Sequence, residues 1–147
     1  MAGNLVIGVS LIVFCMIVQC AMVAVVVRPL MTGKHRHEDD GSFFFLAYYL
    51  SAVLLTLLVG NLFQVIIWGF AFTLLGEFEG LGEAIYHSMV NFTSLGYGDI
   101  VMSEEHRLLG SLEAMNGMLM IGLSTSVLYS VFQFTFQQRH HHQFPDK

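Results

Sequence analysis

The stretch that decides the fold reads Thr93-Ser94-Leu95-Gly96-Tyr97-Gly98-Asp99. Glycine enters backbone conformations with φ > 0 far more easily than other residues do, so Gly96 and Gly98 allow successive carbonyl groups to turn toward one side. Leu95 and Tyr97 would then point away from that side and pack behind the loop, while Ser94 adds a hydroxyl oxygen. Such a row of oxygens can replace the water shell of a cation. We therefore predict a cation-binding loop at residues 94–99.

Long apolar segments lie on both sides of this loop. The chain has 147 residues, of which 55% are hydrophobic and only 12% are charged. Residues 5–27 and 43–75 carry no charge, and residues 108–136 carry only Glu113. A helix needs about 20 apolar residues to cross a bilayer, so we expect an all-α membrane protein with three spanning helices. The first is expected to be retained, because its apolar run is too long for a signal peptide and no basic region precedes it.

The segment before the loop is too short to span a membrane. Residues 84–93 are moderately apolar and cover about three helical turns. A re-entrant helix is the natural interpretation, and irregular backbone at membrane depth is tolerated only where it is buried in protein or lines a watery cavity. The loop should therefore face a pore. One chain supplies only one side of it, so four copies around an axis would complete rings of oxygens.

These features divide the chain into consecutive parts. We expect an N-terminal spanning helix at residues 1–28, a first loop at 29–42, a pore domain at 43–137 and a tail at 138–147. The pore domain is predicted to contain an outer helix at 43–75, a pore helix at 83–93, the loop at 94–99 and an inner helix at 107–136.

The basic residues predict an orientation. Of the six Lys and Arg residues, Arg28 borders the first loop, Lys34 and Arg36 lie in it, and Arg139 and Lys147 lie in the tail. Lys and Arg concentrate on the cytoplasmic side of a membrane protein. We therefore expect the first loop, residues 29–42, and the C-terminus in the cytoplasm, and the N-terminus outside the cell membrane. Acidic residues gather on the outer side, where they are either solvated or attract cations: Glu77, Glu79, Glu83, Asp99, Glu104 and Glu105.

With this arrangement the sequence resembles the potassium-channel superfamily, in which two membrane helices flank a re-entrant pore helix and a TVGYGD-type filter. The resemblance covers roughly residues 43–136 and is greatest to small prokaryotic channels of the two-helix pore type, here with an extra N-terminal helix. The filter departs from the common pattern at Ser94, where threonine is usual, and at Leu95, where valine is usual. The resemblance implies passive, selective conduction of K⁺.

The resemblance also implies roles for residues around the filter. Tyr86 and His87 stand where the family often has an aromatic pair behind the filter, and Tyr86 could there hydrogen-bond Asp99. Val90 stands where some members have an acidic residue coupled to that aspartate. The implied filter runs from Thr93 to Asp99. Within it, the resemblance implies that K⁺ is held by Ser94, Leu95, Gly96 and Tyr97.

The third apolar segment carries the positions that the resemblance links to gating. Gly117 matches a hinge glycine and Gly122 a second family glycine, although close helix packing explains such glycines equally well. The side chains then expected to line the cavity are those of Met118, Ile121 and Thr125.

Polar residues inside the apolar segments are costly unless they are paired. Asn61 and Gln64 share one helix face, as do Glu113 and Asn116, so each pair is expected to meet a neighbouring helix. For Glu113 we expect a partner behind the filter, at His87, Ser88 or Asn91, and hence a role in supporting the filter.

Other functions find no support in the sequence. The first helix lacks the repeated arginines of a voltage sensor, and the chain shows no nucleophile and base pair, phosphate loop or metal-ligand spacing. We expect no enzymatic activity and no cofactor, with K⁺ only as the permeant ion. The expected partners are the other copies in a homotetramer, the lipid bilayer and K⁺, without nucleic acid. Two alternatives stay open: a poorly selective monovalent cation channel, and a non-conducting regulatory subunit with the pore fold.

Overall fold

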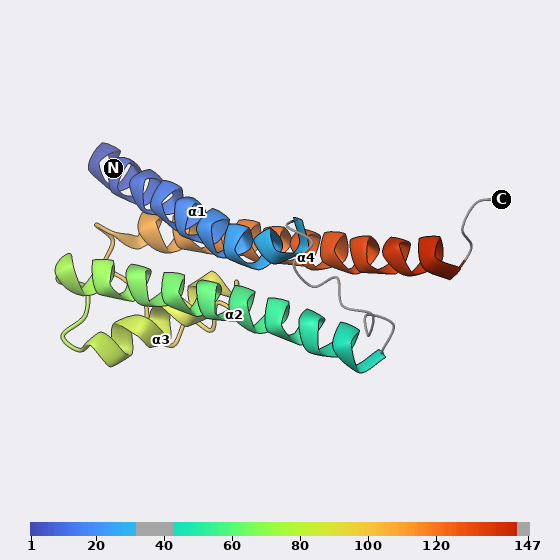
Figure 1. The fold of residues 1–147 in the computed structure, drawn as a ribbon. Coiled ribbons are helices and arrows are strands. Elements are labelled where there is room, and N and C mark those ends of the chain that lie inside the picture. The colour runs from blue at the N-terminus through green and yellow to red at the C-terminus, as the bar shows by residue number, and fades with distance from the viewer. Residues whose placement is uncertain (32–42, 144–147) are drawn as a thin grey trace.

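The computed structural model describes residues 1–31 and 43–143, which form four helices (Figure 1). They are α1 (Ala2–Met31), α2 (Phe43–Leu74), α3 (Leu81–Phe92) and α4 (Arg107–Gln143). Of these, α1, α2 and α4 are long and apolar enough to cross a membrane. The predicted all-α class with three spanning helices is confirmed. Residues 32–42 of the predicted first loop and residues 144–147 of the tail lie outside the described residues.

The helix ends differ in detail from the predicted boundaries. α3 begins at Leu81 rather than at residue 83, and α4 continues to Gln143 rather than ending at residue 136. After α2, Gly76 adopts a φ of 77°, its N–H donates to the Thr73 carbonyl over 3.1 Å, and the next N–H donates to the Phe72 carbonyl over 3.1 Å. A left-handed glycine with these two bonds is the Schellman motif that ends helices. It turns the chain so that α3 packs back against α2.

The three long helices lie side by side, and α3 lies against α2 (Figure 1). α1 is attached near both of its ends. Asn4 Nδ2 donates to the carbonyl of Glu105, in the segment before α4, while the Tyr49 hydroxyl of α2 donates to the carbonyl of Val26 over 2.9 Å. The start of α1 therefore lies at the same end of the bundle as the segment that leads into α4.

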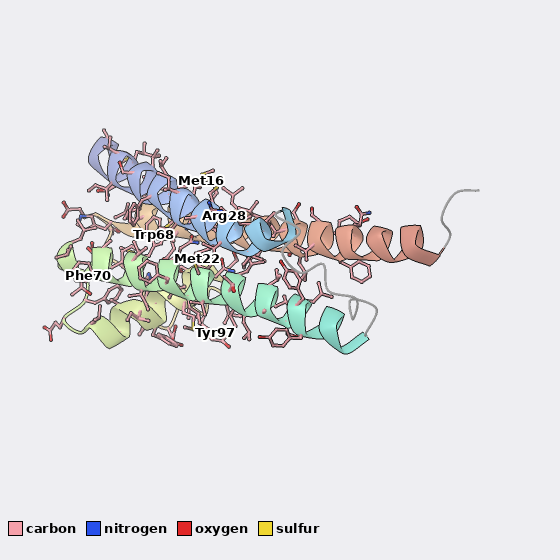
Figure 2. The ribbon with its side chains drawn as sticks, in the orientation of Figure 1. Met16, Met22, Arg28, Trp68, Phe70 and Tyr97 are labelled. Atoms are coloured by element: carbon pink, nitrogen blue, oxygen red, sulfur yellow. The ribbon has the colours of Figure 1, made fainter. Side chains whose placement is uncertain are left out.

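Two apolar clusters join the helices. In the first, the fully buried Trp68 of α2 belongs with Ile12 and Cys15 of α1 and Leu109 of α4, and Figure 2 shows Trp68 between the ribbons of α1 and α2. The second lies toward the other end of the bundle and contains Val26, Val53, Leu57 and Val131. Because α1 contributes to both clusters, it is an integral part of the bundle.

The outer surface of the bundle is also apolar. Val6, Leu55 and Phe70 are 67%, 61% and 55% exposed. A protein in water rarely presents so much contiguous apolar surface. Lipid, or further protein within the membrane, is the surrounding that fits it.

The end of α3 lies tightly against α4 at Gly117. A Cβ added there would lie 2.6 Å from the carbonyl carbon of Phe92 and would overlap its oxygen. Gly122, further along α4, has nothing within 4 Å of an added Cβ. Close packing therefore explains why position 117 needs a glycine, but it does not explain the glycine at position 122.

We predict opposite effects of alanine at these glycines. Gly117→Ala should force α3 and α4 apart and cost about 1–3 kcal/mol, the usual range for overpacking. Gly122→Ala should leave stability unchanged or raise it by up to about 1 kcal/mol, the helix propensity difference. Thermal unfolding of both variants in detergent micelles tests this, and equal melting temperatures would contradict the packing assigned to Gly117.

Candidate functional site

The loop between α3 and α4 has an unusual backbone. Three alternate residues, Ser94, Gly96 and Gly98, have φ values of 58°, 59° and 72°. Consecutive carbonyl groups in an extended strand point to opposite sides, and a left-handed residue at every second position turns them toward the same side. The sequence analysis assigned this freedom to the two glycines only. Ser94 adopts the same conformation as a non-glycine residue, at a cost of about 1–3 kcal/mol.

Hydrogen bonds to the last turn of α3 hold the start of this loop. The N–H of Ser94 donates to the Asn91 carbonyl over 2.8 Å. The N–H groups of Leu95 and Gly96 both donate to the Val90 carbonyl, over 3.0 and 3.3 Å. Carbonyls at the end of a helix would otherwise lack partners, so the loop and α3 stabilise each other. The same hydrogen bonds keep the loop at the C-terminus of α3, the negative end of the helix dipole, which favours a nearby cation.

The far end of the loop is attached to α3 by a side-chain bond. The Tyr86 hydroxyl donates to Asp99 Oδ2 over 2.7 Å, which is the contact suggested by the resemblance. This hydrogen bond lowers the pKa of Asp99 below its ordinary value because it favours the charged carboxylate. α3 therefore holds the loop at both of its ends.

His87 connects α3 to the backbone just beyond the loop. Its Nδ1 lies 3.1 Å from the Ile100 carbonyl oxygen and its Nε2 lies 2.8 Å from Asn91 Nδ2. A carbonyl only accepts and an amide nitrogen only donates, so the ring is neutral with its proton on Nδ1. The rings of Phe72 and Phe78 enclose it at centroid distances of 5.8 and 5.0 Å.

Ser88 connects α3 to both α2 and α4. Its hydroxyl lies 2.8 Å from the Val65 carbonyl oxygen and also contacts Glu113 Oε1. A carbonyl only accepts, and a hydroxyl carries a single hydrogen. Both bonds form together when Ser88 donates to Val65 and a protonated Glu113 donates to Ser88. Of the partners expected for Glu113 behind the filter, Ser88 is therefore one that the structure supplies.

Glu77 secures the segment between the loop and α4. Its carboxylate accepts from the Ser103 N–H over 2.8 Å, from the Ser103 hydroxyl over 2.7 Å and from His106 Nδ1 over 2.6 Å. Its side chain is only 7% exposed. The sequence placed Glu77 among the acidic residues of the outer side, and in this structure it is a partly buried hydrogen-bond acceptor. Spacing in the sequence gives no sign of this contact, because 29 positions separate Glu77 from His106.

Several predicted site residues stand on open surfaces. Leu95 and Tyr97, expected to pack behind the loop, are 55% and 67% exposed in the single chain. Figure 2 shows Tyr97 on the side of the molecule away from α1. Met118 and Ile121 are 59% and 44% exposed, and Thr125 is exposed beside them on α4. Val90, by contrast, is buried.

The geometry so far is a short helix and a carbonyl-rich loop between two helices able to span a membrane. The family model described as "Ion channel" matches residues 60–134, which include the second half of α2, all of α3, the loop and α4 as far as residue 134. The chain belongs to this ion channel family. No curated protein and no solved structure matches the chain significantly. α1 lies outside the matched residues, so the ion channel pattern itself does not account for it.

Gln19 of α1 was not among the residues predicted from the sequence to need a partner, yet it is fully buried. Its Oε1 accepts from Gln64 Nε2 over 2.8 Å, and its Nε2 donates to Ser124 Oγ over 3.0 Å. Asn116 Nδ2 lies 3.5 Å from Gln64 Oε1. Gln64 and Asn116 thus meet neighbouring helices as expected, whereas the buried Oδ1 of Asn61 has no hydrogen-bond partner among the described residues. The signal that could have found Gln19 is a lone amide in an otherwise apolar spanning segment.

We predict that the Glu77 contacts make stability depend on acid pH. Burial raises the pKa of Glu77, but the bonds from Ser103 and His106 lower it further than burial raises it, so the folded pKa lies below the ordinary 4.5. The stabilisation is fully present above the unfolded pKa and is lost as the pH falls through the folded one. Glu77→Gln should remove this part of the acid dependence, measured by thermal unfolding between pH 7 and 3. Glu79→Gln, at an exposed position nearby, is the control and should retain it.

We also predict that Glu113 acts as a hydrogen-bond donor. Glu113→Leu should lower the free energy of unfolding by roughly 1 kcal/mol, the scale of hydrogen bonds between membrane helices. Glu113→Gln should lower the free energy of unfolding by less, because the glutamine amide can still donate to Ser88. Chemical unfolding in micelles compares the two variants, and an equal loss for both would contradict the donor role.

Proposed function

We propose that the chain is one subunit of a homotetrameric potassium channel of the cell membrane, resembling small prokaryotic channels. The observation that carries the proposal is the alternation of left-handed residues at Ser94, Gly96 and Gly98, at the end of a short helix in a chain of the ion channel family. Carbonyl oxygens arranged in this way can replace the water shell of a cation. Membership of the family supports ion conduction, and the filter sequence supports K⁺ as the ion.

Fourfold assembly is supported by what one chain leaves incomplete. A single loop offers oxygens from only one side, whereas four loops around an axis offer closed rings. Leu95 and Tyr97 are exposed in the single chain and would gain cover from neighbouring subunits. The open face of α4 at Met118, Ile121 and Thr125 would line the cavity below the filter.

In the proposed mechanism, K⁺ exchanges water for oxygens at Ser94, Leu95, Gly96 and Tyr97. Asp99, held as a carboxylate by Tyr86, attracts cations to the outer mouth. Several sites in file let an arriving ion displace the next, so binding does not prevent exit. The proposed orientation places the loop and the N-terminus on the outside and the end of α4 in the cytoplasm, in accord with the positive-inside rule.

A poorly selective cation channel is the alternative that a particular observation favours. Ser94 carries a strained φ of 58° and a smaller side chain than the usual threonine. Both features sit at the inner end of the filter, where a looser ring would discriminate less between K⁺ and Na⁺. A non-conducting regulatory subunit is the further reading that the same measurements address.

Ion flux through the purified protein tests these functions. In liposomes that contain only this chain, we expect K⁺ currents whose reversal potential in mixed K⁺ and Na⁺ follows the K⁺ gradient. A reversal potential near zero under these bi-ionic conditions would favour the poorly selective channel. Absence of flux at all pH values, voltages and lipid compositions tried would favour the regulatory subunit.

Alanine at Gly96 tests whether the loop backbone carries the flux. Gly96→Ala places a Cβ at a φ of 59°, which costs about 1–2 kcal/mol in each subunit, and we expect K⁺ flux to fall at least about tenfold. Gly82→Ala is the matched control, because Gly82 lies in α3 with open space around it and no positive φ. Equal flux in the two variants would contradict the role of the loop.

A further inference from the structure

A chain of buried amides starts and ends on α4. Asn116 faces Gln64 of α2, Gln64 donates to Gln19 of α1, and Gln19 donates to Ser124. The Ser124 hydroxyl in turn donates to the Met120 carbonyl over 2.8 Å. Every donor along this path therefore has one acceptor, and the path leaves α4 before Gly117 and returns to it after Gly122.

The bonds of Gln19 connect three helices at one level. Gln19, Gln64 and Asn116 have no exposed surface, and an amide released into such surroundings loses its partner without gaining water. Gly60 of α2 provides the space: a Cβ there would lie 3.0 Å from Gln19 Oε1 and 3.5 Å from Met22. Figure 2 shows Met22 between the ribbons of α1 and α2. The Gln19 amide thus lies in a space between α1 and α2 that the absence of a side chain at Gly60 leaves open.

The two glycines of α4 differ in their freedom to bend the helix. Gly117 is held under the Phe92 carbonyl, so a bend there would disturb the end of α3 and with it the filter. Gly122 faces open space, and a bend there would leave the filter support in place. The bond from Gln19 to Ser124 meets α4 just beyond Gly122 and therefore restrains that bend.

We propose that Gln19 is a positioning residue that holds the part of α4 beyond Gly122 against α1 and α2. The inference rests on the proposed channel function and adds to it a role for α1, which lies outside the matched family residues. α1 and α2 occupy the buried side of α4, so a released segment can move only toward the open side, where Met118 and Ile121 are exposed. In the tetramer this is the pore side. Loss of the Gln19 bond therefore narrows the inner end of the pore.

Single-channel recording of Gln19→Leu and Ser124→Ala tests this role. A hydrogen bond between membrane helices contributes about 0.6 kcal/mol on average, so the ratio of open to closed states should fall about threefold per subunit, or on the order of 50-fold if four subunits move together. Unitary conductance and reversal potential should stay unchanged, because the filter is untouched. In the double variant, the ratio of open to closed states should be no lower than in Gln19→Leu alone.

Two control variants remove the same kinds of side chain at positions where they do not join α1 to α4. Ser130→Ala removes a hydroxyl that donates within α4, to the Ser126 carbonyl over 2.9 Å. Gln133→Leu removes an exposed amide that donates to the Tyr129 hydroxyl on the same helix. Both should leave the open probability unchanged. If Gln19→Leu and Ser124→Ala also leave it unchanged, or if they alter conductance or selectivity instead, the positioning role is overturned.

A distance measurement decides the inference even if the unsubstituted protein carries no current, a result that would overturn the proposed function alone. Spin labels at Val25→Cys and Tyr129→Cys report the separation of α1 and α4 on exposed positions, with Cys20→Ser removing the exposed native thiol. The added Gln19→Leu change should shift the distance distribution to larger values, and Ser130→Ala should not. Identical distributions with and without Gln19 would overturn the proposal.

Discussion

Backbone groups at membrane depth have no water to bond, and the proposed position of residues 94–99, between two helices able to span a membrane, places this constraint on their structure. An irregular loop is tolerated there only where protein holds it or a watery pore receives it. The N–H groups at its start bond the last carbonyls of α3, so these groups do not need the loop's own carbonyls as partners. The other contacts of α3 then serve to hold that short helix in place.

Buried polar side chains provide those contacts. Ser88 joins α3 to α2 and α4, and His87 joins it to the backbone after the loop. Glu77 holds the segment that leads into α4. Apolar packing against lipid-like surroundings gives little directional preference, whereas each hydrogen bond requires a particular partner at a particular place. Position in this bundle is therefore set by a few polar residues and close glycine contacts.

α1 extends the same principle to a helix that the ion channel pattern does not include. Its apolar residues join both clusters of the bundle, and Gln19 bonds α2 and α4 in the region of Gly122. A helix that served only as a membrane anchor would need no buried amide. The cost of burying one is offset by the bonds that fix α1 against α4 just beyond Gly122.

Apolar run length predicted the three helices able to span a membrane, and the two glycines predicted the left-handed backbone of the loop, because both depend on local chemistry that a sequence displays directly. Polarity within apolar runs also identified Gln64, Asn116 and Glu113 as residues in need of partners. Only the tertiary structure decided which partners they have, that Ser94 shares the left-handed conformation, and that Gly117 is packed while Gly122 is free. Gln19 and Ser124 are 105 positions apart, and such contacts follow from how helices are packed, which no periodicity along one helix specifies.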